Sequence, residues 1–212
     1  EEIFFTGSGT ESDNMALKGV LYGPAGKGKK HLITTKIEHH AVLHTAMALE
    51  KEGFRVTFLE VDQNGQVKLD QLEQAIDEDT ALVSIMAANN EVGTIQPIQQ
   101  IGEICQRHGV LFHTDAVQAF GHMPLDVTAM HIDLLSLSAH KINGPKGTGA
   151  LYIRKGLGLK PVIEGGGQER NRRSGTENVA GIVGLGAAAQ LARETMEEES
   201  QRLKKLSRKL ID

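Results

Sequence analysis

The sequence lacks the features that mark secreted, membrane-spanning and nucleic-acid-binding proteins. Its single cysteine, Cys105, excludes an intrachain disulfide, and no charged-then-apolar signal peptide opens the chain, so a reducing, cytoplasmic compartment is expected. No apolar run approaches the roughly 18 residues that cross a bilayer, which argues against a membrane protein. The 23 Lys and Arg residues are outnumbered by 27 Asp and Glu residues, so the basic excess typical of nucleic-acid binders is missing too.

Neither end of the sequence carries the signals of a chain terminus. The first residues, Glu1–Thr6, already have the pattern of a strand and do not begin with Met. Ala187–Asp212 has the pattern of a helix still in progress, because no Gly or Pro stop signal follows it. We therefore expect a piece of a longer protein, truncated at both ends.

Short apolar or β-branched runs alternate with helical patterns along the chain. The expected strands are Ile3–Thr6, His31–Thr35, Arg55–Leu59, Leu82–Met86, Val110–Thr114, Leu134–Ser138 and Gly149–Ile153. The expected helices between them are Ser12–Leu21, His39–Glu52, Leu69–Ile76 and Ile98–His108. This alternation predicts an α/β fold, with a mostly parallel sheet covered by helices on both faces.

Polar, titratable or glycine residues follow five of the expected strands. They are Gly7–Thr10, Glu38–His40, Asn89–Glu91, Asp115 with Gln118, and Ser138 with His140 and Lys141. Open sheets of this class bind ligands outside the carboxyl ends of their strands. The sequence therefore predicts a site at that edge of the sheet.

The glycine turn Gly7-Ser8-Gly9-Thr10 is a candidate phosphate-binding site. Free backbone N–H groups and the positive end of the following helix dipole suit a phosphate there. The turn lacks both the G-x-G-x-x-G spacing and the Lys-Ser/Thr of a P-loop, so dinucleotides and nucleoside triphosphates are disfavoured. An ordinary N-cap by Thr10 or Ser12 would explain the same residues.

Two charged residues at strand ends suggest an aldehyde cofactor. Lys141 has Ser138 three residues before it and His140 beside it, and a partly desolvated lysine there can form a Schiff base, although most lysines are solvated loop residues. Asp115 follows a buried strand and can pair with the protonated ring nitrogen of a pyridine. The alternative for Asp115 is an N-cap for the turn through Gln118.

The histidines and the cysteine admit several interpretations. His39 can lie flat against an aromatic ligand. His40 and His44 have the i, i+4 spacing of zinc-binding pairs, but a Glu in the H-E-x-x-H position and an obvious third ligand are missing, so no metal site is predicted. Cys105 falls on the inward stripe of a helix and is expected to be an inert core residue.

Six motifs occur in the order typical of one enzyme family. They are Ser8-Gly9-Thr10-Glu11-Ser12-Asp13-Asn14, Glu38-His39-His40-Ala41-Val42, Asn89-Asn90-Glu91-Val92-Gly93, His113-Thr114-Asp115-Ala116-Val117-Gln118, Ser138–Gly147 and Gly165–Asn178. Together they resemble the class I cysteine desulfurases, fold type I pyridoxal 5′-phosphate enzymes that serve iron–sulfur cluster assembly. The resemblance implies a cofactor-binding large domain over residues 1–186, with residues 187–212 starting the helix towards a largely absent small domain.

The resemblance also implies a role for each matching residue. Lys141 would carry pyridoxal 5′-phosphate and shuttle the Cα proton of cysteine. Asp115 would pair with the pyridine nitrogen, and His39 would stack on the ring and take part in proton transfer. The other implied contacts are Gly9, Thr10, Ser138 and His140 around the phosphate, Gln118 at the phenolic oxygen, Asn90 near that oxygen and the substrate carboxylate, and Thr176 at the phosphate of a neighbouring subunit.

The implied reaction converts L-cysteine to L-alanine and leaves the sulfur as a persulfide on an enzyme cysteine. A homodimer would then pass the sulfur to an iron–sulfur scaffold or another acceptor protein. The family's sulfur-accepting cysteine lies in a loop well after the lysine, and Cys105 does not match it, so the isolated chain is not expected to complete the reaction. A selenocysteine lyase-like enzyme and a non-catalytic dimerising or scaffolding fragment remain alternatives.

Overall fold

The computed structural model describes residues 1–211 and has the expected α/β fold. Its strands are β1 (Ile3–Thr6), β2 (His31–Thr35), β3 (Arg55–Leu59), β4 (Thr80–Ser84), β5 (Leu111–Asp115), β6 (Leu134–Ser138) and β7 (Gly149–Ile153). Its α-helices are α1 (Gly9–Leu21), α2 (His40–Lys51), α3 (Leu69–Ala75), α4 (Ile98–His108), α5 (Gln168–Asn171) and α6 (Val179–Ile211). Two short 3₁₀ helices are η1 (Pro24–Gly26) and η2 (Ala139–Ile142). The main deviation among the strands is β4, which begins two residues before the expected Leu82.

The seven strands form one sheet in the order β1-β7-β6-β5-β4-β2-β3. The pairs among β2 to β6 are all parallel, as expected. The exception is β7, which runs antiparallel to both β6 and β1. Only η2 and a short loop separate β6 from β7, which is too little chain for the helical crossover that a parallel neighbour requires.

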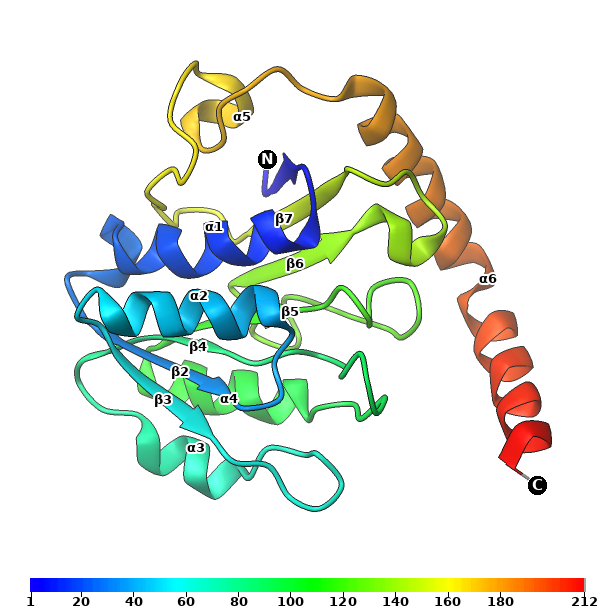
Figure 1. Ribbon diagram of the computed structural model, residues 1–212, viewed down its shortest axis with the longest axis horizontal. Coiled ribbons are helices and arrows are strands. Elements are labelled where there is room, and N and C mark those ends of the chain that lie inside the picture. Colours follow the sequence, from blue (N-terminus) through cyan, green and yellow to red (C-terminus); the bar gives the residue numbers. More distant parts are fainter. Residues whose placement is uncertain (212) are drawn as a thin grey trace.

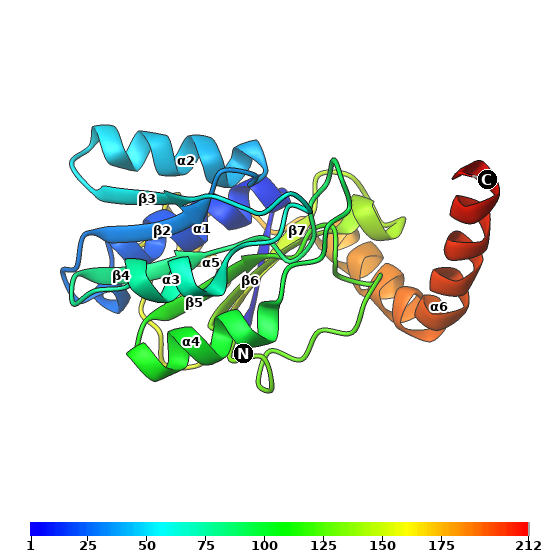
Figure 2. The same ribbon diagram turned by 90° about the horizontal axis from the view of Figure 1, so that it is seen from below.

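Two hydrophobic cores, one on each face, hold the helices against the sheet. Figure 2 shows α2 and α4 on opposite sides of the sheet. The first core joins apolar side chains of α1 and α2 to β2, β4, β6 and β7. The second joins α3, α4 and the first turns of α6 to the opposite face. Both faces are therefore covered, and the carboxyl ends of the parallel strands remain open for a site.

A glycine in α4 allows the helix to approach the chain ahead of β6. A Cβ atom added to Gly102 would lie 2.0 Å from the carbonyl oxygen of Met130, which is backbone and cannot move aside cheaply. We expect Gly102→Ala to lower the free energy of unfolding by about 3 kcal/mol through this overpacking. Unfolding by denaturant measures this change in the free energy of unfolding. Gly186→Ala in α6 is the matched control, because no atom lies within 4 Å of the added Cβ, and it should be neutral or stabilising. Equal effects of the two substitutions would contradict the close approach.

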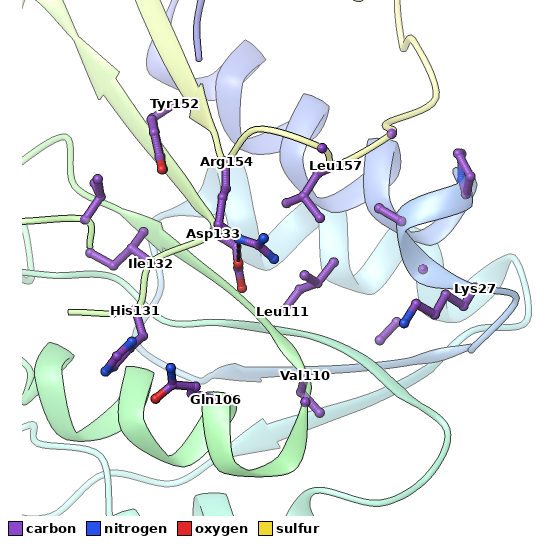
Figure 3. Close-up of a pocket in the computed structure, with 18 of the residues that line it drawn as sticks. Lys27, Gln106, Val110, Leu111, His131, Ile132, Asp133, Tyr152, Arg154 and Leu157 are labelled. Carbon is purple, nitrogen blue, oxygen red and sulfur yellow. Dashed lines mark hydrogen bonds and ion pairs between the residues drawn. The ribbon is translucent and has the colours of Figure 1, made fainter. Parts of the chain in front are cut away.

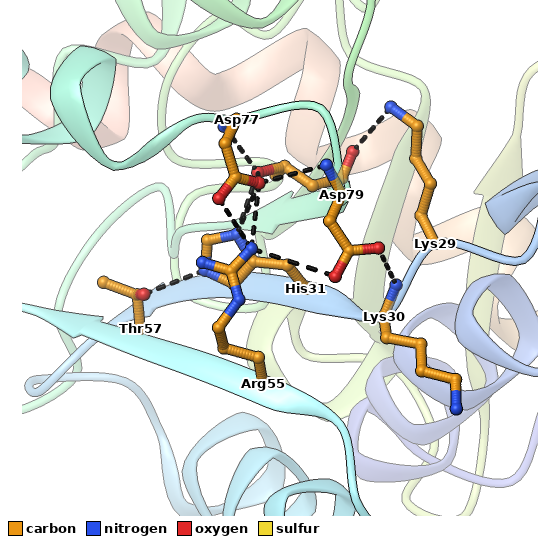
Figure 4. Close-up of polar contacts among 8 residues, drawn as sticks. Lys29, Lys30, His31, Arg55, Thr57, Asp77 and Asp79 are labelled. Atoms are coloured by element: carbon orange, nitrogen blue, oxygen red, sulfur yellow. Dashed lines mark hydrogen bonds and ion pairs between the residues drawn. The ribbon is translucent and has the colours of Figure 1, made fainter.

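A polar cluster ties β2, β3 and β4 together at their amino ends (Figure 4). The ring nitrogens of buried His31 lie 2.8 Å from the hydroxyls of Thr80 and Thr57. Arg55 of β3 donates to both carboxylate oxygens of Asp77, in the turn before β4. Burial, followed by the nearby Arg55 charge, lowers the pKa of His31 below its ordinary value. The His31 imidazole in this cluster is therefore neutral. The cluster lies at the edge of the sheet opposite the expected site.

The long helix α6 crosses the predicted domain boundary at residues 186/187. It begins at Val179, earlier than the helix expected over 187–212, and Asp212 lies outside the described residues. Its first turns pack on the core through Leu185 and Ala188. Its C-terminal half extends away from the sheet in Figure 1. The division into two domains at this boundary stays a prediction. Among residues 1–211, no helix is long and apolar enough to span a membrane.

Candidate functional site

A cavity of about 350 Å³ opens at the carboxyl ends of the parallel strands. Every site residue predicted from the sequence except Thr176 lines it: Gly9, Thr10, His39, Asn90, Asp115, Gln118, Ser138, His140 and Lys141. Gly9, Asp115 and Ser138 are buried, whereas Thr10, His39, Asn90 and His140 are exposed at its rim. The volume suits one small-molecule ligand.

Thr176 lies elsewhere, in the loop before α6. It lines a separate cavity of about 90 Å³ together with Gly7, Thr148 and Glu177. Its side chain is exposed, and Thr176 is not among the residues that line the candidate cavity of its own chain. A role in a neighbouring subunit remains a prediction.

A larger cleft of about 920 Å³ lies at the opposite edge of the sheet (Figure 3). Several of its charged groups are held by contacts within the chain. The Arg154 guanidinium, turned towards Asp133 in Figure 3, forms an ion pair with that carboxylate, and Lys29 donates to the Thr80 carbonyl. The smaller cavity has the convergent titratable groups that mark a chemical site, and it is the candidate functional site.

The start of α1 forms one wall of this cavity. Ser8 caps the helix: its hydroxyl accepts a hydrogen bond from the Glu11 backbone N–H, and its carbonyl accepts one from Ser12. The backbone N–H groups of Gly9 and Thr10 are left without helical acceptors. A Cβ atom added to buried Gly9 would lie 2.6 Å from Cγ2 of Val117. Glycine at this position therefore lets the N-terminus of α1 lie close to the strand ends. The positive end of the helix dipole favours an anion there. The expected N-cap by Thr10 or Ser12 is wrong: Ser8 caps the helix, and Thr10 and Ser12 lie inside it.

Lys141 projects from the 3₁₀ turn that follows β6. The Ser138 hydroxyl, at the end of β6, lies 2.8 Å from Nδ1 of His140, which fixes the two side chains relative to each other. Lys141 is half-buried, and its carbonyl accepts a hydrogen bond from Nε2 of His122. The turn ends at Asn143 in the left-handed conformation, so it places Ser138, His140 and Lys141 at one wall of the cavity.

Asp115 is a buried carboxylate at the floor of the cavity. Its Oδ1 accepts a hydrogen bond from the Val117 backbone N–H at 2.9 Å, so it does cap a turn as the alternative interpretation proposed. Burial raises the pKa of Asp115 above its ordinary value, while that hydrogen bond and the charges of His39 and Lys141 oppose the rise. A cation bound beside it would remove the cost of ionising this carboxyl.

His39 forms the N-cap of α2 and faces the same cavity. Its Nδ1 accepts a hydrogen bond from the Ala41 backbone N–H at 3.1 Å. In the neutral ring the proton therefore sits on Nε2. The cap fixes both the tautomer and the orientation of the imidazole, as a residue that contacts a ligand requires.

Two further buried acids were not predicted as site residues. Asp13 of α1 lines the cavity and is 1% exposed, and its Oδ1 has no hydrogen-bond partner within the chain. Burial, followed by the charge of Asp115, raises the pKa of Asp13 well above its ordinary value. Glu38 lies nearby, and burial raises its pKa to about 8 although Thr35 and Met86 donate hydrogen bonds to it. An Asp on the inward face of a helix is the sequence signal that identifies such a residue.

The close approach of Asp13 to His113 is not an ion pair. The two polar atoms, Oδ1 and Nε2, lie 3.6 Å apart in a fully buried setting. Burial lowers the pKa of His113 to about 3, and its ring is held between the hydroxyls of Ser84 and Ser136. A neutral imidazole beside a protonated Asp13 is the state that this burial favours.

Cys105 lies in the core, as predicted. It is 1% exposed in α4, and burial raises the pKa of its thiol to about 12. The reactive thiolate is therefore about a thousandfold scarcer than for an ordinary cysteine. This thiol is not a plausible acceptor for sulfur leaving the cavity.

The inertness of Cys105 is directly measurable. We expect labelling by a thiol reagent at pH 8 to be at least about a thousandfold slower in the native chain than in denaturant, because burial removes both access and thiolate. A stopped-flow or colorimetric thiol assay gives both rates. Rapid labelling of the native chain would contradict the burial of this residue.

Comparisons with known proteins match the chain over nearly its whole length. The profile of the family "Aminotransferase class-V" matches residues 1–212. "Cysteine desulfurase IscS" of Clostridium botulinum is 59% identical over 210 residues, which are 99% of this chain and 53% of that protein. The chain thus spans about half the length of the curated relatives it matches.

Solved structures with similar sequences have the same fold as this chain. The structure of a NifS-like protein superposes with a TM-score of 0.95 at 50% identity, covering 99% of this chain and 58% of that one. A structure described as "SspA in complex with cysteine" superposes with a TM-score of 0.86 at 48% identity, covering 89% of this chain and 55% of that one.

Proposed function

Because the chain belongs to the aminotransferase class-V family, which depends on pyridoxal 5′-phosphate, we propose that it is the cofactor-binding half of a cysteine desulfurase. The complete protein would take sulfur from L-cysteine and leave L-alanine. The observation that carries this proposal is the convergence of Lys141, Asp115 and His39 on one cavity that is bounded by a helix N-terminus. The names of the similar proteins support cysteine as the substrate class.

The residues of the cavity fit the cofactor. Asp115 is a buried carboxyl with a raised pKa, and it needs a cationic partner such as a protonated pyridine nitrogen. The first turn of α1 presents backbone N–H groups where Gly9 leaves no room for a Cβ atom, which suits a phosphate. When bound, the cofactor supplies an electron sink for the bonds around the substrate Cα atom.

The chain's own residues then hold and move protons around this centre. Lys141 would hold the cofactor through its Nζ atom and, once substrate has released that amine, would carry a proton to or from the substrate Cα atom. His39, whose Nδ1 accepts the Ala41 N–H, would present Nε2–H to the ligand, and Asp115 would keep the ring nitrogen protonated. Ser138, His140 and the start of α1 hold the anionic end, so the ring is fixed at both ends.

The sulfur acceptor comes from outside the part of the chain described here. Cys105 is the only cysteine of the sequence and is buried with a raised pKa. The acceptor thiol, the homodimer to which Thr176 would contribute, and delivery to an iron–sulfur scaffold belong to the complete protein. A cytoplasmic location is proposed because the one cysteine of the sequence is free and buried, which suits a reducing compartment.

Product formation by the cofactor-loaded chain tests this function. With L-cysteine and excess dithiothreitol as the acceptor thiol, we expect alanine and sulfide in equal amounts, and neither product from Lys141→Ala. Selenocysteine as a parallel substrate distinguishes a lyase-like preference. No cysteine-dependent product from a chain that binds the cofactor would instead support a scaffolding fragment and overturn the proposal.

A further inference from the structure

Two buried carboxyl groups face the candidate cavity from different elements, Asp13 from α1 and Asp115 from the end of β5. His113 and Asp115 are two residues apart in β5, so their side chains point to the same face of the sheet. On that face, Nε2 of His113 lies 3.6 Å from Oδ1 of Asp13. The three side chains therefore form one buried polar cluster between α1 and β5.

No cation of the chain neutralises Asp13 in this cluster. Among residues 1–211, its one contact at ion-pair distance is to His113, and that ring is neutral because burial lowers its pKa to about 3. Burying two carboxylates without a counter-charge is costly, and two like charges in one site oppose each other. The cavity therefore favours at most one ionised carboxyl, and the second acid keeps its proton.

We propose that Asp13 and Asp115 act as one acid pair that presents a single negative charge to the ring nitrogen of the cofactor, with Asp13 as the second positioning residue. This inference rests on the proposed cofactor site. Asp115 carries the charge because the Val117 N–H stabilises its carboxylate, whereas Oδ1 of Asp13 has no donor. When Asp115 is replaced by a neutral residue, Asp13 ionises and compensates in part, as a charge rather than as a hydrogen-bond acceptor.

The other titratable groups around the pair do not take this role. They are Glu38 after β2, His39 of α2, His113 of β5, and His140 and Lys141 of η2. Glu38 is the remaining acid, and its carboxyl already accepts hydrogen bonds from Thr35 and Met86. After burial, the charge of Asp115 is the largest cause of the raised pKa of Asp13. Loss of that charge should therefore make Asp13 easier to ionise.

Absorbance titration with pyridoxal 5′-phosphate at pH 7 tests the pair in the parent, in Asp13→Asn, in Asp115→Asn and in the double variant. Asp13→Asn alone should change the affinity little, because a neutral amide replaces a neutral acid of the same shape. In the Asp115→Asn background, the same substitution should weaken binding by a further factor of about ten, because it removes the compensating charge. Asp126→Asn, which changes an exposed turn residue outside the cavity, is the matched control and should add nothing in either background.

Two spectroscopic readouts distinguish this exchange of charge from a purely structural role of Asp13. With cofactor labelled by ¹⁵N in the ring, the nitrogen chemical shift should indicate a protonated ring in the parent and in Asp13→Asn. It should be intermediate in Asp115→Asn and that of a neutral ring in the double variant. In the cofactor-free chain, ¹³C spectra of the carboxyl groups should show Asp13 ionising at a lower pH in Asp115→Asn than in the parent.

The outcomes separate this inference from the proposed function. An Asp13 titration that is unchanged in Asp115→Asn would overturn the pair, whether or not the cofactor binds. An equal effect of Asp13→Asn on affinity in both backgrounds would overturn it as well. A parent chain that binds no cofactor would overturn the proposed function and with it the role of the pair towards the ring, whereas the carboxyl titration would still decide whether the two acids are coupled.

Discussion

Glu38→Gln is expected to stabilise the chain at high pH and to change little at low pH. Glu38 is 5% exposed, and burial raises its pKa from 4.5 to about 8. Between these two values the folded chain retains a proton that the unfolded chain has lost. The free energy of unfolding therefore falls as the pH rises through this window, and the full penalty applies above pH 8.

The size of this effect follows from the shift in pKa. At pH 9 the buried charge costs about 4 kcal/mol, which Gln avoids because it stays neutral. The amide oxygen can still accept the hydrogen bonds that Thr35 and Met86 donate. At pH 5, where Glu38 is protonated in the fold, parent and variant should have similar stability.

Urea unfolding of the cofactor-free chain at pH 5, 7 and 9 measures the difference. Comparing variant with parent at each pH cancels the contributions of groups that do not interact with Glu38, whereas the charges of Asp13 and Asp115 remain part of the measured difference. Glu78→Gln is the matched control, because Glu78 is exposed. A stability difference between Glu38→Gln and the parent that does not grow with pH would show that Glu38 is ionised in the fold throughout.

Asp115→Asn is expected to weaken cofactor binding by about a hundredfold or more. The substitution removes one partner of a buried charge pair and leaves the ring nitrogen without an acceptor anion. It retains an oxygen that can accept the Val117 N–H, so the local turn should survive. Because burial raises the pKa of Asp115, the cofactor-free variant should also be more stable than the parent above neutral pH.

Absorbance titration with pyridoxal 5′-phosphate and thermal unfolding of the cofactor-free chain give the two quantities. Asp126→Asn is the matched control, since Asp126 also caps a turn through backbone N–H groups but lies outside the cavity. Weaker binding together with a more stable fold is the signature of a residue kept for ligand binding. Unchanged affinity in Asp115→Asn would contradict the role assigned to this carboxylate.

The sequence predicted the sheet well because its strands are short apolar runs with clear boundaries. It predicted the cavity because carboxyl ends of parallel strands meet at one edge, which brings Asp115 and Lys141 together although they are distant in the chain. The antiparallel β7 was not anticipated, since apolar alternation carries no information on strand direction. The start of α6 was also misplaced: the helix begins at Val179 and includes Gly181 and Gly184, which approach Thr148 and Pro145 although glycine is unfavourable in a helix interior.

The buried acids show the limit of sequence reasoning in this site. Asp13 and Glu38 lie within motifs that the sequence analysis quotes, but neither stands out there as a site residue. Their raised carboxyl pKa values depend on burial, which the sequence does not show. Only the fold places these two carboxyls near Asp115, where the absence of water raises their pKa values. The stacking of His40 on His44 is similar, since the spacing permits a pair and only the side-chain conformation makes one.

Covalent capture of the cofactor is the most direct test of the proposed function. The chain is incubated with one equivalent of pyridoxal 5′-phosphate, reduced with borohydride, digested and mapped by mass spectrometry. We predict a pyridoxyl mass on Lys141, lost in Lys141→Ala and retained in Lys146→Ala, which changes an exposed lysine of the next loop. A pyridoxyl mass spread over surface lysines, in the same yield with or without Lys141, would contradict the assignment of this cavity.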